Sequence, residues 1–303
     1  MNSVLKTNIT TIYLMGFCHS FMVVIPVFVP LLQGYGLTMS EVLQTQALFA
    51  MTIALLEVPS GYIADLCGRK QALIIGSLAN AVGFLWLLGA DSFFDFMVYE
   101  FILGVGISLI SGADLALLYD SETELQALGD RAAGPGRSLS RLISIEAGAS
   151  GVAGIVASLL LVWADMAILL AVQAVVGLLP FCLAWRLQEA RRPHSEKGHA
   201  DNARHIVELL LFGRPVLLWT VIAIVCFGLL GLYSFWVYQK YWELNGVPVV
   251  YFGYIWAAFA LTVSLAARYA GVIEQRLGWR NLLLVTAILP LFGLLGMALS
   301  GGW

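Results

Sequence analysis

The sequence predicts an all-α integral membrane protein with two helical bundles, six helices in the first and about three in the second. Three observations predict this fold class. Apolar residues make up 60% of the chain and charged residues 12%, whereas an ordinary soluble domain has roughly 45–50% apolar residues, glycine included, and about 25% charged residues. The apolar residues form runs long enough to cross a bilayer. The chain also resembles itself at a shift of 210 residues.

Composition and the absence of known motifs also argue against several classes of function. The net charge of −3 gives no sign of a nucleic-acid partner. Cys18, Cys67, Cys182 and Cys226 show neither CxxC spacing nor a paired framework, so we expect no disulfide, metal site or cofactor. The chain lacks HExxH, GxSxG and a phosphate-binding loop, so we do not expect an enzyme.

A bilayer core requires about 20 mostly apolar residues in each helical crossing. Continuous apolar runs without strict alternation indicate helices rather than barrel strands. The predicted crossings are 9–31, 42–63, 71–90, 93–119, 139–162, 166–187, 215–239, 249–272 and 281–301.

Lysine and arginine residues predict the orientation. With alternating crossings, Lys240 lies on one side and the other 15 of the 16 basic residues lie on the opposite side. By the positive-inside rule, the N-terminus and the segments 64–70, 120–138 and 188–214 are then cytoplasmic. We expect a multi-pass protein of the cell (inner) membrane.

The internal repeat predicts the domain organisation. Without a gap, residues 36–73 match residues 246–283 at ten of 38 positions. These are Gly36, Ala47, Phe49, Ala50, Thr52, Leu55, Gly61, Ile63, Gly68 and Leu73. We therefore expect an N-terminal bundle at 1–188, a cytoplasmic linker at 189–214 and a partial C-terminal bundle at 215–303. A full second copy would extend about 95 residues, or three helices, beyond Trp303, so we expect a truncated chain.

The stretch PSGYIADLCGRK, residues 59–70, concentrates charge between two apolar runs. Its Gly61, Asp65, Gly68, Arg69 and Lys70 resemble the cytoplasmic loop motif of the major facilitator superfamily of secondary transporters, with Leu66 where a basic residue is common. SGADLALLYDS, residues 111–121, also resembles the end of helix 4 in a poorly characterised bacterial branch of that family. The resemblance implies transport of a small solute by alternating access of two bundles.

The motif makes physical sense as a conformational latch between helices 2 and 3. Gly61 and Gly68 permit a tight turn and close helix approach. Asp65 is able to cap the incoming helix or accept hydrogen bonds from a cation of the facing bundle. Arg69 and Lys70 would hold the loop at the anionic cytoplasmic surface, although the positive-inside rule alone also explains these two residues.

Charged residues within crossings are costly and indicate function. Glu100 and Asp114 fall on one face of the fourth predicted helix, which lines the central cavity in the resembled family. We expect them to line a polar path and to couple solute movement to protons; the alternative is that both are wetted at the two membrane interfaces. For Asp120 the interfacial position is favoured.

Several further residues are weaker candidates. His19 and Gln239 are possible cavity residues, although a lone histidine is more often simply hydrogen-bonded in a bundle core. Glu57, Arg141 and Glu146 are expected to form a structural ion network.

Glycines at 148, 151 and 154 predict close packing of the fifth helix against a neighbour that moves. This helix lacks the Gly-Pro pair of the family's antiporters, which argues against a drug/proton antiporter. The expected partners are a small solute of unknown identity, the lipid bilayer and protons as the coupling ion. The competing hypothesis is a truncated remnant or a non-transporting membrane scaffold of the same fold.

Overall fold

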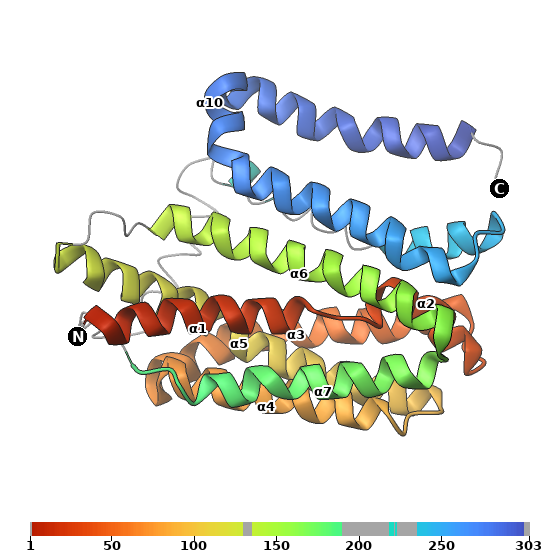
Figure 1. Ribbon diagram of the computed structural model, residues 1–303, viewed down its shortest axis with the longest axis horizontal. Helices are drawn as coiled ribbons and strands as arrows, with labels where there is room; N and C mark the ends of the chain where they lie inside the picture. Colours follow the sequence, from red (N-terminus) through yellow and green to blue (C-terminus); the bar gives the residue numbers. More distant parts are fainter. Residues whose placement is uncertain (1, 130–134, 190–217, 221, 223–234, 300–303) are drawn as a thin grey trace.

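The computed structural model describes residues 2–129, 135–189, 218–220, 222 and 235–299. Across these residues the secondary structure is helical and contains no strand, which confirms the predicted all-α class (Figure 1). The helices are α1 (Asn2–Ser20), η1 (Ile25–Val27), α2 (Phe28–Gly34), α3 (Met39–Cys67), α4 (Arg69–Leu87), α5 (Phe93–Ala127), α6 (Pro135–Trp163), α7 (Met166–Ala184), η3 (Val249–Tyr251) and α10 (Phe252–Leu299). Residues 235–244 are also helical.

Seven stretches within the described residues are long and apolar enough to cross a membrane. They account for eight of the predicted crossings, because the last stretch contains two. The predicted crossing 215–239 and the linker 189–214 lie largely outside the described residues. We refer to the two ends of the bundle as the α2 end and the Gly68 end, after the elements found there.

The predicted first crossing, 9–31, lies within the apolar stretch Ser3–Gly34, but its helix is broken. Helix α1 ends at Ser20, and a short 3₁₀ turn, η1, precedes α2. Pro26 stands in the first turn of η1 and Pro30 in α2. A proline inside a helix has no N–H to donate and its ring clashes with the carbonyl one turn earlier. The break follows from these prolines.

The connection between α3 and α4 also differs from the predicted loop at 64–70. Helix α3 continues to Cys67 and α4 begins at Arg69, so Gly68 alone joins them. Gly68 has φ 114° and ψ 140°, a conformation that needs glycine. Gly61 does not bring helices together as expected, because a Cβ there would meet no heavy atom of the described structure within 4 Å.

Backbone geometry supports the 210-residue repeat. Gly36 and Gly246 both have positive φ, 89° and 73°, and so do Gly68 and Gly278, 114° and 73°. Each pair is separated by 210 positions. Gly278 lies where α10 bends back on itself (Figure 1). The 48 residues of α10 would span about 70 Å if straight, so the bend divides them into the two predicted crossings.

Small residues bring α6 and α10 close together, as the sequence predicts. A Cβ on Gly154 would lie 2.6 Å from the carbonyl oxygen of Gly253, and one on Gly151 would lie 3.4 Å from Cβ of Ala260. One turn further, the Ser264 hydroxyl donates to the Ser144 carbonyl at 2.8 Å. Small side chains allow such contact between helices in a bilayer, where van der Waals packing drives association.

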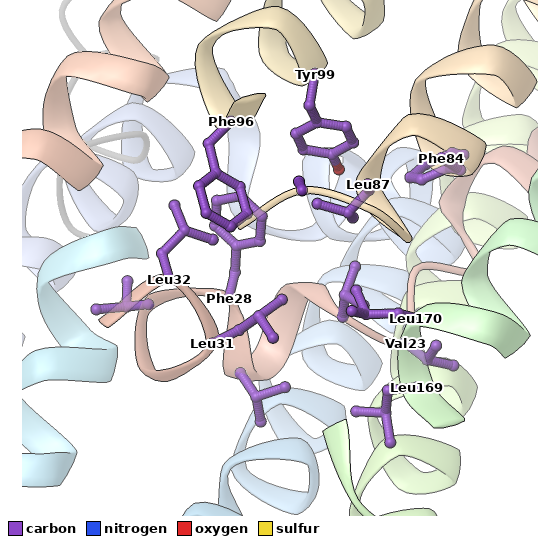
Figure 2. Close-up of a cluster of buried hydrophobic side chains, with 14 of the residues drawn as sticks. Val23, Phe28, Leu31, Leu32, Phe84, Leu87, Phe96, Tyr99, Leu169 and Leu170 are labelled. Carbon is purple, nitrogen blue, oxygen red and sulfur yellow. The ribbon is translucent and has the colours of Figure 1, made fainter. Parts of the chain in front are cut away.

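A cluster of buried apolar side chains fills the α2 end, and we call it the α2-end cluster. Figure 2 shows Phe28 of α2 and Phe96 and Tyr99 of α5 pointing toward one another. Trp236 and Phe252 belong to the same cluster, and the rings of Phe28 and Trp236 lie 5.3 Å apart. The cluster therefore joins α1–α7 to the later crossings.

A second buried cluster lies toward the Gly68 end. Its members all come from α1, α3–α7 or the residues just after α7. They are Ile12, Met15, Ala64, Ala72, Leu73, Ile110, Ala113, Leu117, Leu118, Leu142, Ala184 and Leu187. Within the described residues, apolar clusters thus join the two parts of the chain at the α2 end and not at the other.

Alanine at Gly253 tests the close contact of α6 and α10. We expect Gly253→Ala to lower the thermal unfolding midpoint in detergent, with a cost of about 1–3 kcal/mol, because the new methyl group collides with the Gly154 carbonyl. Gly271→Ala, in the same helix, adds its methyl group to open space and should leave the midpoint unchanged or raise it. Equal midpoints for the two variants would contradict the close contact.

Candidate functional site

A cavity of about 520 Å³ lies next to the α2-end cluster. Its wall combines residues of α1, η1, α4, α5 and α6 with Phe235 of the later part of the chain. The lining residues are Gly16, His19, Ser20, Met22, Ile25, Asn80, Ile107, Ile110, Ser111, Asp114, Ile143, Glu146, Ala147, Ser150 and Phe235. Met22, Ile25 and Phe235 also pack against the α2-end cluster, so they separate the cavity from that end.

Among the described residues, three titratable side chains line this cavity: His19 from α1, Asp114 from α5 and Glu146 from α6. Nε2 of His19 lies 3.5 Å from the Ser77 hydroxyl. Oε1 of Glu146 lies 3.1 Å from the place that a Cβ on Gly16 would occupy, so the carboxylate reaches the surface of α1 that this glycine leaves bare. His19 and Asp114 were predicted cavity residues, whereas Glu146 was assigned to an ion network.

The position of Glu146 could have been found from helical spacing. Ile143, Glu146, Ala147 and Ser150 all line the cavity, and their spacing of three and four residues marks one helix face. The predicted ion network placed Glu146 by its nearness in sequence to Arg141 and not by this helix face.

Glu100 lies apart from the cavity lining, although it shares a face of α5 with Asp114. It is 3% exposed, and its carboxylate accepts a hydrogen bond of 2.5 Å from Gln46 Nε2 of α3. At 1.5 Å per residue, the two carboxylates are about 21 Å apart along the helix axis. Glu100 and Asp114 therefore lie in separate environments although they share one face of α5.

Gln239 also lies outside the lining, and its amide joins the break in the first crossing. Its Nε2 donates to the Ile25 carbonyl at 2.8 Å, and its Oε1 accepts from the Val29 N–H at 3.0 Å. In an unbroken helix, these two backbone groups would bond to each other. Gln239 is 1% exposed, so its side chain replaces the missing helical bond in the absence of water. Positions 29 and 239 are separated by 210 residues, the shift of the internal repeat, so they are equivalent positions in the two copies.

The residues of the predicted latch connect α4 to α5 and to the end of α7. Arg69 pairs with Asp120 and donates to the Ala116 carbonyl at 2.7 Å. The Arg69 and Asp120 side chains are only 16% and 12% exposed. Asp120 is therefore a member of this set, and its assignment to a wetted interface is wrong. Asp65 lies exposed in the last turn of α3.

Lys70 completes the set through two contacts. Its Nζ donates to the Trp185 carbonyl at 3.1 Å, and its backbone N–H donates to the Glu189 carboxylate at 2.8 Å. Glu189 was not among the predicted residues, because it is distant in sequence; its carboxylate satisfies a free N–H in the first turn of α4.

The structure does not bring Glu57, Arg141 and Glu146 together. The guanidinium group of Arg141 lies 5.7 Å from the centre of the Tyr13 ring, whereas Glu57 is exposed on α3. Among these described side chains no ion pair forms, because Arg141 faces outward from α6 while Glu146 faces the cavity.

These features define a class: an all-helical integral membrane protein with a cavity among its crossings that is mostly apolar and carries a few charged and polar side chains. A family model described as Major Facilitator Superfamily matches residues 11–303. The chain therefore belongs to the Major Facilitator Superfamily, and it is a membrane transporter rather than a member of an enzyme family. A search of curated proteins found no matching relative. Proteins of this family bind small-molecule substrates within a membrane.

Removal of the Gln239 amide tests its role at the break. In Gln239→Leu, the buried Val29 N–H loses its partner, which costs about 1–3 kcal/mol, while the Ile25 carbonyl keeps only its bond from the Phe28 N–H. We expect faster amide hydrogen exchange in the peptide covering residues 25–32, measured by mass spectrometry. Gln44→Leu, an equal change at an exposed site of α3, is the control. Unchanged exchange in Gln239→Leu would show that the amide does not stabilise the break.

Proposed function

We propose that this protein is a secondary transporter that moves a small solute through the cavity by alternating access. The moving bodies are the crossings of residues 1–188 and those of residues 215–303, with 189–214 as the linker between them. In the state described by the structure, the α2 end is closed. Opening would require the two bodies to separate at the α2-end cluster and to approach each other at the Gly68 end.

One observation carries this proposal: the cavity lies directly beneath an apolar closure made by both bodies. Met22 and Ile25 come from the first body and Phe235 from the second, and all three both line the cavity and pack on the α2-end cluster. The Gln239 contacts with Ile25 and Val29 add polar bonds to the same closure. Side-chain packing and two hydrogen bonds are contacts that a rocking motion is able to break and restore.

The distribution of basic residues supports an inward-facing assignment. Lys6, Arg69 and Lys70 lie toward the Gly68 end, whereas Lys240 lies near the α2 end and contacts Gln33 at 3.3 Å. By the positive-inside rule the Gly68 end and the N-terminus are cytoplasmic. The protein would then lie in the cell membrane with its closed end outside.

Proton coupling in this proposal is assigned to Asp114. Its carboxylate lines the cavity together with Glu146 and His19, so its charge would respond to what the cavity contains. Glu100 is engaged with Gln46 outside that lining, and we assign it a structural role in joining α3 to α5.

Labelling of a cavity thiol tests alternating access without knowledge of the solute. Ser111 lines the cavity, and Ser111→Cys in a background free of the four native cysteines places one thiol there. We expect a membrane-impermeant thiol reagent to label it from either side of oriented vesicles. Asn245→Cys near the α2 end and native Cys67 near the Gly68 end, both exposed, mark the two sides.

A cross-link at the closed end supplies the control. Gln33→Cys and Lys240→Cys, joined by a short bifunctional reagent, should abolish labelling of Ser111→Cys from the outer side and preserve it from the cytoplasmic side. Reduction of the cross-link should restore both. Labelling from a single side before and after cross-linking would refute alternating access and favour a scaffold.

Asp114→Asn tests the coupling assignment in the same assay. With the pH of the labelling side held constant, a pH change on the opposite side should alter the labelling rate of Ser111→Cys, because protonation of Asp114 shifts the balance of the two states. We expect Asp114→Asn to remove this response and Glu100→Gln to retain it. A response that persists in Asp114→Asn would contradict the assignment.

A further inference from the structure

The cavity has an unusual balance of charge and hydrogen-bonding groups. Asp114 and Glu146 contribute two carboxylates, and the described lining contains no lysine or arginine. Arg69 and Arg141, basic side chains of the neighbouring helices α4 and α6, are engaged with Asp120 and Tyr13 instead. Residues 215–239, the predicted seventh crossing, contain neither lysine nor arginine in their sequence. The charged groups of this wall are therefore acceptors of hydrogen bonds.

Two neutral groups of the lining also lack a partner. Oδ1 of Asn80 and Oγ of Ser111 are buried, and neither makes a hydrogen bond within the described structure. Asn80 is only 2% exposed. The Asn80 oxygen lies against Gly106 of α5 and both atoms are closed off from the cavity, so a ligand would be recognised by the two carboxylates instead. A carboxylate ligand would bring further acceptors and a repelling charge.

The remaining wall is apolar and contains an aromatic ring. Ile107, Ile110 and Ile143 line it together with Phe235. The Phe235 ring packs edge-on against Trp236 and Trp256, with centroid distances of 4.4 and 4.6 Å. Its neighbours therefore hold the ring in place. A held aromatic face attracts cations, and the isoleucines favour an apolar body.

From these observations we propose that the cavity binds a small organic cation, an amine whose ammonium group lies between Asp114 and Glu146 and whose apolar part packs on the isoleucines and Phe235. An ammonium group donates up to three hydrogen bonds and accepts none, which complements the carboxylates of Asp114 and Glu146. A volume of about 520 Å³ falls within the range of small-molecule sites. The inference rests on the proposed function, because it names the solute class of that same cavity.

Three phenyl compounds of similar size and different charge test the solute class. Phenethylamine is a cation at neutral pH, 2-phenylethanol is neutral and 3-phenylpropanoate is an anion. Binding to the purified full chain in detergent is measured by isothermal titration calorimetry. We expect the amine to bind at least about tenfold more tightly than either other probe, because charge-assisted hydrogen bonds form with the amine alone. Equal binding of the alcohol, or tighter binding of the anion, would overturn the proposal.

Variants locate the binding and separate it from general destabilisation. Glu146→Gln and Asp114→Asn keep the side-chain volume and should each weaken amine binding by about tenfold or more, with alcohol binding unchanged. Asp91→Asn, an equal change in the exposed turn before α5, should have no effect. Unchanged amine affinity in both cavity variants would refute the site. Thermal unfolding of each variant confirms that it is folded.

Protection of a cavity thiol distinguishes failure of this inference from failure of the proposed function. Phenethylamine should slow the labelling of Ser111→Cys, whereas 3-phenylpropanoate should not. If labelling alternates between the two sides but no amine protects the thiol, the transporter proposal stands and the solute class is wrong. If the amine protects the thiol but labelling is confined to one side, the cation site stands and the transport proposal fails.

Discussion

The break in the first crossing is the constraint on which the closed end of this molecule depends. Prolines 26 and 30 prevent a continuous helix, and a bilayer offers no water to satisfy the backbone groups that the break leaves free. Gln239, from a distant part of the chain, accepts from the free Val29 N–H and adds a second donor to the Ile25 carbonyl, which also accepts from the Phe28 N–H. Local backbone chemistry in the first body thereby requires a partner from the second. This requirement places the joint between the bodies above the cavity.

Different kinds of contact hold the helices within each body and the two bodies together. Close glycine contacts hold α6 against α10, while Arg69, Lys70 and their partners on α5 and α7 hold the first body together near the Gly68 end. The Arg69 pair is largely buried, so it fixes how α4 lies on α5. The α2-end cluster joins the two bodies through apolar side chains and ring contacts, which depend less on direction than hydrogen bonds do. The most directional contacts of that joint are those of Gln239.

Much of the fold could be predicted from the sequence because bilayer thickness imposes a length on every crossing. The repeat was visible for a related reason: Gly36, Gly68, Gly246 and Gly278 have positive φ angles, so they mark equivalent turns. Contacts between distant residues were not accessible in this way. Helix periodicity placed Glu100 and Asp114 on one face but did not show that Glu100 meets Gln46 on α3. Nor did it show that Asp120 pairs with Arg69.

In the proposed transport cycle the two bodies rock about a joint at the α2 end, where Gln239 supplies buried polar contacts. Electron–electron distance measurements in lipid nanodiscs test it most directly, with one spin-label pair at Gly34→Cys and Asn245→Cys and another at Cys67 and Arg276→Cys. In Gln239→Leu, we predict that more molecules show a long distance between the two labels at the α2 end. We also predict that more molecules show a short distance between the two labels at the Gly68 end. Lengthening at both ends together, or no change at either end, would contradict the account.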